Sequence, residues 1–122
     1  MYRKILVTLD TTSSDREILP HIARLAVLLK SELLLVHVAD GFAARHFNEL
    51  RLAESDEMKA DQAYLEGVAG KLRGGGLTVA IKLALGNPPT EIVRTAAAEN
   101  CDLIALTSHG HRLIGDVLRA KP

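Results

Sequence analysis

Hydrophobic residues gather in short runs along the chain, separated by longer amphipathic segments. Residues 4–9 form a run rich in β-branched side chains, which predicts a buried strand. Residues 32–39 are almost continuously apolar, a pattern typical of a strand covered on both faces of a parallel sheet. Residues 77–85 alternate, which indicates a strand with a more exposed face, nearer the sheet edge. Residues 102–107 complete a set of four predicted strands.

The segment after the first strand has apolar residues at helical spacing. Ser14 and Glu17 stand three residues apart, which fits a capping box at the start of a helix. The apolar stripe then continues to about Lys30. Pro20 lies deeper than the first helical turn, so we expect a kink there or a later helix start.

Three further helices are predicted between and after the remaining strands. Periodicity is absent from residues 41–48, and helical spacing returns over residues 58–72 before three consecutive glycines. A short helix, which Thr90 can cap, stops at Asn100. A last apolar stripe covers residues 113–118.

Strand and helix therefore alternate four times within one domain, residues 1–122. Right-handed crossovers turn that order into an α/β fold: an open, doubly wound, mostly parallel, Rossmann-like sheet. Ligands of such sheets bind beyond the carboxyl ends of the strands, where the strand order reverses. We expect the strands beginning near Lys4 and Asp102 to be neighbours. The loop at Asp10 and the turn at Ser108-His109-Gly110 should then share one cleft.

Composition and charge argue against two classes of partner, nucleic acid and membrane. Fifteen basic and fifteen acidic residues leave a formal net charge of zero, which argues against a nucleic-acid partner. The apolar runs are far shorter than a membrane span and no hydrophobic leader opens the chain, so we expect a cytoplasmic protein without a membrane partner. Cys101 is the single cysteine and favours a buried apolar role.

The two loops carry the residues most suited to ligand chemistry. Gly110 would let a phosphate approach the amides that open the last helix, or it merely supplies a positive φ. Asp10 could accept from a ribose hydroxyl or an adenine amino group, or it serves as a loop or capping carboxylate. Val38 offers backbone groups and an apolar wall. His109 and His111 lack further ligands at a recognisable spacing, so no metal site is predicted.

Four blocks of sequence, at residues 4–10, 35–40, 86–88 and 102–111, are similar to successive landmarks of the universal stress protein family. The resemblance covers essentially the whole chain. It implies an adenine nucleotide alpha hydrolase-like fold and a regulatory stress-response domain that binds ATP or another adenine nucleotide. The family continues into a fifth strand that commonly pairs two subunits, whereas this chain stops at Pro122. We therefore expect a truncated domain or an unusual homodimer.

The resemblance also assigns roles to residues. Thr8, Asp10 and Val38 would line the base and ribose, and Leu106 would close the adenine pocket. Ala120-Lys121 stands where the family has Gly-Ser, so the phosphate loop is degraded and binding is expected to be weak. A nucleotide-associated Mg²⁺ is the only metal expected. The predicted nucleotide contacts are Thr8, Leu9, Asp10, Val38, Leu106, Thr107, Ser108, Gly110, His111, Ala120 and Lys121.

Enzyme classes with a similar architecture lack their signatures here. A phosphoacceptor receiver needs an Asp closing the third strand, where this chain has Leu85-Gly86. A nucleotidyltransferase needs His-x-Gly-His after its first strand, and a hydrolase needs Gly-x-Ser-x-Gly, which is absent. We therefore predict a binding protein rather than an enzyme. The alternative is a nucleotide-independent adaptor that acts through protein–protein contacts or dimerisation.

Overall fold

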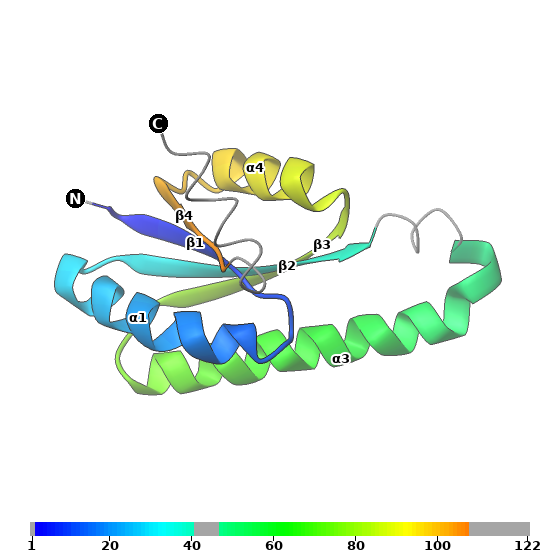
Figure 1. Cartoon of the computed structure of the whole chain (residues 1–122), viewed down its shortest axis with the longest axis horizontal. Coiled ribbons are helices and arrows are strands. Elements are labelled where there is room, and N and C mark those ends of the chain that lie inside the picture. The colour runs from blue at the N-terminus through cyan, green and yellow to red at the C-terminus, as the bar shows by residue number, and fades with distance from the viewer. Residues whose placement is uncertain (1, 41–46, 108–122) are drawn as a thin grey trace, which may run out of the picture.

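In the part of the chain that the computed structural model describes, residues 2–40 and 47–107, parallel strands form one open sheet (Figure 1). The strand order is β3-β2-β1-β4. All three pairings are parallel, and β1 lies between β2 and β4 as the sequence predicts. The strands are β1 (Lys4–Thr8), β2 (Glu32–Asp40), β3 (Val79–Gly86) and β4 (Leu103–Ala105).

The helices cover both faces of this sheet (Figure 1). α1 (Ser14–Leu29) and α3 (Phe47–Gly74) lie on one face, and α4 (Pro88–Ala98) lies on the other. Right-handed crossovers explain this division. The chain moves in one direction from β1 through β2 to β3, and then returns past β1 to β4, so the last crossover helix lies on the opposite face. The doubly wound fold is therefore confirmed.

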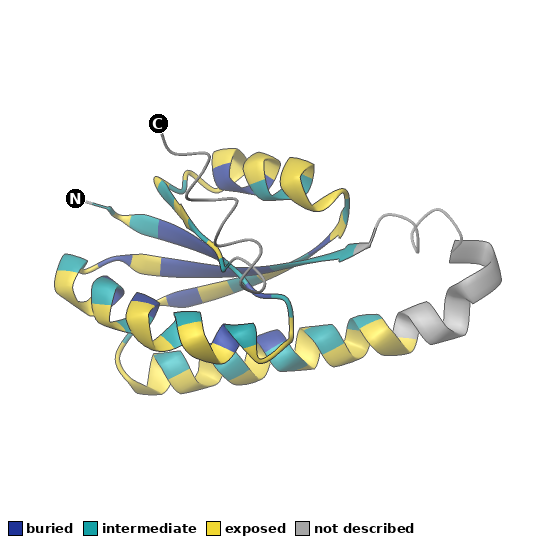
Figure 2. Cartoon of the chain, in the orientation of Figure 1, coloured by how far each residue is buried: buried dark blue, intermediate teal, exposed yellow. Residues whose placement is uncertain are grey.

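The core consists of two layers, because successive strand residues point to opposite faces. Ile5 and Val7 pack with residues of α1 and α3, whereas Leu6 and Val36 pack with Ala96 of α4. All of these side chains are buried, and Figure 2 colours the ribbon of buried residues dark blue. Burying one aliphatic side chain of this size stabilises the fold by roughly 1.5–3 kcal/mol.

The start of α1 differs from the predicted capping box. The helix begins at Ser14 and its N-cap is Ser13, which makes no side-chain capping hydrogen bond. The Ser14 hydroxyl instead accepts from Thr12 Oγ1 at 3.2 Å. The alternative of a later helix start is also wrong, since α1 begins at Ser14 and Pro20 lies inside it. The buried carboxylate of Asp15, in the first turn, instead accepts hydrogen bonds from the loop that precedes the helix.

α3 begins at Phe47, well before the residues with apolar periodicity, and extends past the end of the sheet (Figure 1). Propensity rather than an apolar stripe supports those first turns, which are rich in Glu, Ala, Leu and Arg. Its backbone is described throughout, and its side chains from residue 56 onward. The predicted helix at residues 113–118 lies outside the described residues.

α4 is capped by Asn87 rather than by Thr90. Asn87 Oδ1 accepts from the Thr90 amide at 3.2 Å and from Thr90 Oγ1 at 3.0 Å. Pro88 occupies the first helical position, where its missing N–H would have had no helical partner. Gly86 has φ +138° and a side chain there would meet Glu91 at 3.0 Å, so glycine suits both the backbone and the space.

Candidate functional site

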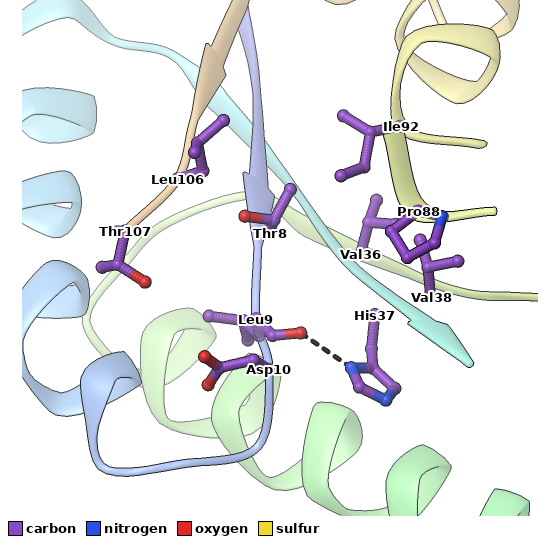
Figure 3. A pocket seen from close by; sticks show the side chains of 10 residues that line it. All are labelled: Thr8, Leu9, Asp10, Val36, His37, Val38, Pro88, Ile92, Leu106 and Thr107. Carbon is purple, nitrogen blue, oxygen red and sulfur yellow. Dashed lines mark hydrogen bonds between the residues drawn. The ribbon is translucent and has the colours of Figure 1, made fainter. Parts of the chain in front are cut away.

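A cavity of about 300 Å³ opens at the carboxyl ends of β1 and β2 (Figure 3). Its other walls come from the start of α4 and from the residues that follow β4. The strand order reverses at β1, since β2 and β4 flank it, so the cavity occupies the topological switch point of the sheet. The lining residues are Thr8, Leu9, Asp10, Val36, His37, Val38, Pro88, Ile92, Leu106 and Thr107.

Residues predicted from three separate segments come together in this cavity. Thr8, Leu9 and Asp10 lie at the end of β1, Val38 lies on β2, and Leu106 with Thr107 follows β4. The loops after the two neighbouring strands thus share one cleft as far as Thr107. The other predicted contacts lie outside the described residues: Ser108, Gly110, His111, Ala120 and Lys121.

Four lining residues were not predicted: Val36, His37, Pro88 and Ile92. Val36 could have been predicted from the sequence, because it stands two residues before Val38 on the same strand and therefore faces the same side of the sheet. Nothing in the sequence around Pro88 and Ile92 indicates that they line the cavity. They reach the cavity because the crossover lays the start of α4 over the ends of β1 and β2.

The walls of the cavity are mainly apolar. Val36 and Val38 form one side, Pro88 and Ile92 of α4 face them, and Leu106 closes the end beside β4 (Figure 3). Small-molecule sites are commonly apolar cavities of roughly 300–1,000 Å³ with a few polar groups that fix orientation. Thr8, Asp10 and Thr107 supply such groups here.

Asp10 has a structural role in the loop after β1. Its Oδ1 accepts from the Thr12 amide at 2.9 Å and from Thr12 Oγ1 at 2.6 Å. This bond from a carboxylate to an amide two residues ahead stabilises a tight turn, in which Thr11 has φ 64°. The loop role considered in the sequence is therefore present. A carboxylate accepts several hydrogen bonds, so this role in the loop is compatible with ligand binding by Asp10.

Asp15 holds the same loop from the first turn of α1. This carboxylate is fully buried and accepts from the Asp10 amide at 3.1 Å and the Thr11 amide at 3.0 Å. Tyr64 of α3 donates its hydroxyl to Asp15 at 2.6 Å. Burial and this hydrogen bond raise the pKa of Tyr64 well above its ordinary value, so the hydroxyl remains a donor at neutral pH. The backbone that carries Asp10 is thus anchored to two helices.

His37 joins the two strand ends to α3. Its Nδ1 lies 2.8 Å from the Leu9 carbonyl oxygen, which can only accept, so Nδ1 is the donor (Figure 3). Its Nε2 lies 3.4 Å from Asp61 Oδ2 of α3. His37 is also among the residues that line the cavity.

The described part of the chain has neither a metal-binding cluster nor a membrane-spanning helix. Within residues 2–40 and 47–107, no three His, Cys, Asp or Glu side chains lie close enough to hold a metal ion. His109 and His111 are outside those ranges. None of the described helices has the length and apolar character needed to cross a membrane.

Comparison with known proteins gives consistent matches. The model of the universal stress protein family matches residues 1–120. Universal stress protein MJ0577 of Methanocaldococcus jannaschii is 28% identical, over 97% of this chain and 83% of its own length. Its solved structure has a TM-score of 0.76 at 27% identity, covering 92% of this chain and 78% of that one. A universal stress protein from Archaeoglobus fulgidus, solved in complex with dAMP, has a TM-score of 0.65 at 26% identity, covering 97% and 87% of the two chains.

Proposed function

This chain belongs to the universal stress protein family, and from that premise we propose that its strand-end cavity binds the adenosine part of an adenine nucleotide. One observation carries the proposal. Residues from three separate segments, each expected to contact the nucleotide, line a single apolar cavity with a carboxylate at its edge. The dAMP complex of the Archaeoglobus fulgidus relative supports the same ligand class.

The lining residues suit the parts of adenosine. The flat, apolar faces of the base match the walls formed by Val38, Ile92 and Leu106, and backbone groups at the end of β2 can bond the edge of the base. Asp10 is the acceptor proposed for a ribose hydroxyl. The anchoring of its loop by Asp15 keeps that acceptor in place before the ligand arrives, which lowers the entropy lost on binding.

We propose that the phosphates contribute less than adenosine does. Ala120 carries a methyl group and Lys121 a mobile charge where the family has Gly-Ser, so the backbone cradle for phosphate is only partly kept. A nucleotide would bring its own Mg²⁺ through its phosphates. The protein then acts as a binding module, which responds to the nucleotide rather than transforming it.

Calorimetric titration of the chain with adenosine, AMP, ADP, ATP and cyclic AMP tests this function, with GTP as the control for the base. Asp10→Ala is expected to weaken adenosine binding about ten- to a hundredfold, since a hydrogen bond to a charged group contributes roughly 1.5–3 kcal/mol. Asp10→Asn is the sharper variant. It keeps an oxygen that can accept from the Thr12 amide while it removes the charge.

A second pair of variants separates the cavity from the rest of the surface. Leu106 is 59% exposed at the cavity, and Val93 is 64% exposed on α4 outside its lining. Leu106→Asp should abolish adenosine binding, because it puts a carboxylate against the base, while Val93→Asp should leave it unchanged. Equal affinity in the wild type, Asp10→Ala and Leu106→Asp would reject the proposed site. Binding of GTP as tight as that of ATP would reject the preference for adenine.

A further inference from the structure

A groove with an apolar floor runs between α1 and α3. These two helices lie on the same face of the sheet (Figure 1). Two cavities of about 550 Å³ each lie along it, and both are lined by Pro20, Ala23 and Leu72. Because they share these residues, the cavities form one continuous groove. It lies on the helical face opposite α4 and shares no lining residue with the strand-end cavity.

One end of the groove exposes large apolar side chains. Val27 is 58% exposed and Leu28 is 78% exposed, and both line the groove. Arg16 lines the opposite end, so along α1 the groove extends over about 18 Å at 1.5 Å per residue. That length matches roughly three turns of a bound helix.

Every charged side chain among the described lining residues is basic: Arg16, Arg24 and Lys71. None of them has an ion-pair or hydrogen-bond partner among residues 2–40 and 47–107. Arg16 and Arg24 come from α1 and Lys71 comes from α3, so positive charge borders the apolar floor from both sides. The positive charge is a property of the groove alone, since the chain as a whole has a formal net charge of zero.

We propose that this groove docks an acidic amphipathic helix of a partner protein. Leucine-type side chains of the partner would fill the floor at Pro20, Ala23 and Leu72, and its flanking carboxylates would pair with the basic rim. Helices bind protein grooves in this way through apolar anchors at successive turns. Charges at the rim then determine orientation and partner choice.

Two other occupants fit the groove less well. A second copy placed by two-fold symmetry would bring this same basic groove against itself and so oppose like charges. A lipid surface is broad, and protein helices meet it with a projecting apolar face. Here Ala23 and Leu72 of the apolar floor are half-buried between two helices, and the most exposed apolar side chains, Val27 and Leu28, lie at one end only.

The probe is a fluorescein-labelled helical peptide of about fourteen residues, with Leu at the a and d positions and Glu at the others. A matched peptide replaces every Glu by Lys. Fluorescence anisotropy with the 122-residue chain measures binding, and amide NMR shifts locate it. We expect the Glu peptide to bind at least about tenfold more tightly than the Lys peptide, with shifts confined to residues 16–28 and 64–77.

Two variants of the groove and one control complete the test. Leu28→Asp and Arg24→Glu should each weaken binding of the Glu peptide about tenfold. Val93→Asp places the same change at a similarly exposed residue of α4, on the opposite face of the sheet, and should leave binding unchanged. Circular dichroism checks that all three variants remain folded, as expected for changes at exposed positions.

Four outcomes would overturn the proposal. The first two are that the Glu peptide does not bind, or that it binds no more tightly than the Lys peptide. The third is that both groove variants bind the Glu peptide as tightly as the wild type does. The fourth is that the NMR shifts fall on residues outside the groove. Sedimentation that shows a dimer lost on Leu28→Asp would assign the groove to a second copy instead. Co-sedimentation with phosphatidylserine vesicles that Leu28→Asp abolishes, without peptide binding, would assign it to a lipid surface.

Discussion

The hydroxyl of Tyr64 donates a 2.6 Å hydrogen bond to the buried carboxylate of Asp15, which joins α3 to the first turn of α1. Asp15 also accepts from the amides of Asp10 and Thr11. One carboxylate therefore satisfies three donors and fixes the loop at the edge of the candidate site. Tyr64 contacts this loop only through Asp15 among the described hydrogen bonds, so its proposed role is to position the loop.

Tyr64→Phe should lower the free energy of unfolding by about 1.5 kcal/mol, because it removes one hydrogen bond to a charged group. It should also weaken adenosine binding several-fold through a looser loop. Urea unfolding and calorimetry measure the two effects. Tyr2→Phe is the control, since the Tyr2 hydroxyl has no hydrogen-bond partner in residues 2–40 and 47–107. Unchanged stability and affinity in Tyr64→Phe would refute this positioning role.

Asp15→Ala should be more damaging than Tyr64→Phe. It leaves the Asp10 and Thr11 amides and the Tyr64 hydroxyl without their acceptor, and an unpaired donor costs up to about 1–3 kcal/mol where water cannot replace the lost partner. In the double variant, Tyr64→Phe should add little to Asp15→Ala, because the two residues form one network. A fully additive loss would show that they act independently.

Triphosphate should add less than about tenfold to the affinity for adenosine. The reason lies in Ala120 and Lys121, residues outside the described part of the chain, where the family has Gly-Ser. The attraction of Lys121 for phosphate should weaken at high salt, as expected for an exposed charge. Ala120→Gly combined with Lys121→Ser should increase the preference for ATP. A large preference for ATP in the unmodified chain that persists at high salt would contradict this prediction.

Asp102 should stabilise the protein in a pH-dependent way. Its carboxylate accepts from the amides of Arg3 at 2.9 Å and Lys4 at 3.1 Å, and these hydrogen bonds lower its pKa. A group whose pKa is depressed by folding stabilises above its unfolded pKa and loses that contribution as the pH falls through the folded value. Asp102→Asn should thus be less stable than wild type near pH 7, and the difference should shrink below about pH 4. Asp56→Asn, at an exposed position of α3, is the control. Urea unfolding that shows a difference growing in acid would contradict the prediction.

Cys101 should react slowly with thiol reagents. Burial raises the pKa of its thiol, and the thiolate is the reactive form. Because the chain has a single cysteine, its reaction with a disulfide reagent can be followed without assignment. At about pH 8 the folded chain should react well below the rate of the urea-unfolded chain. Equal rates would show that the thiol is not protected by the fold.

Much of the fold could be predicted because it depends on local pattern. The continuous apolar run of β2 and the alternation in β3 reflect how many faces each strand buries, and the structure places β2 inside the sheet and β3 at its edge. The parallel pairing of β1 with β4 then brings Asp10 and Leu106 to the same end of the sheet. For the same reason, all six described residues of the predicted site line one cavity.

Contacts that depend on how the helices pack against the sheet were determined only by the tertiary structure. Asp15 looks like an ordinary acidic residue in a first helical turn, and it becomes a buried hub only because α3 brings Tyr64 to it. Pro88 and Ile92 enter the cavity through the placement of α4, and the groove exists through the spacing of α1 and α3. A sequence specifies which face of each helix is apolar, whereas the packing of three layers specifies what that face meets.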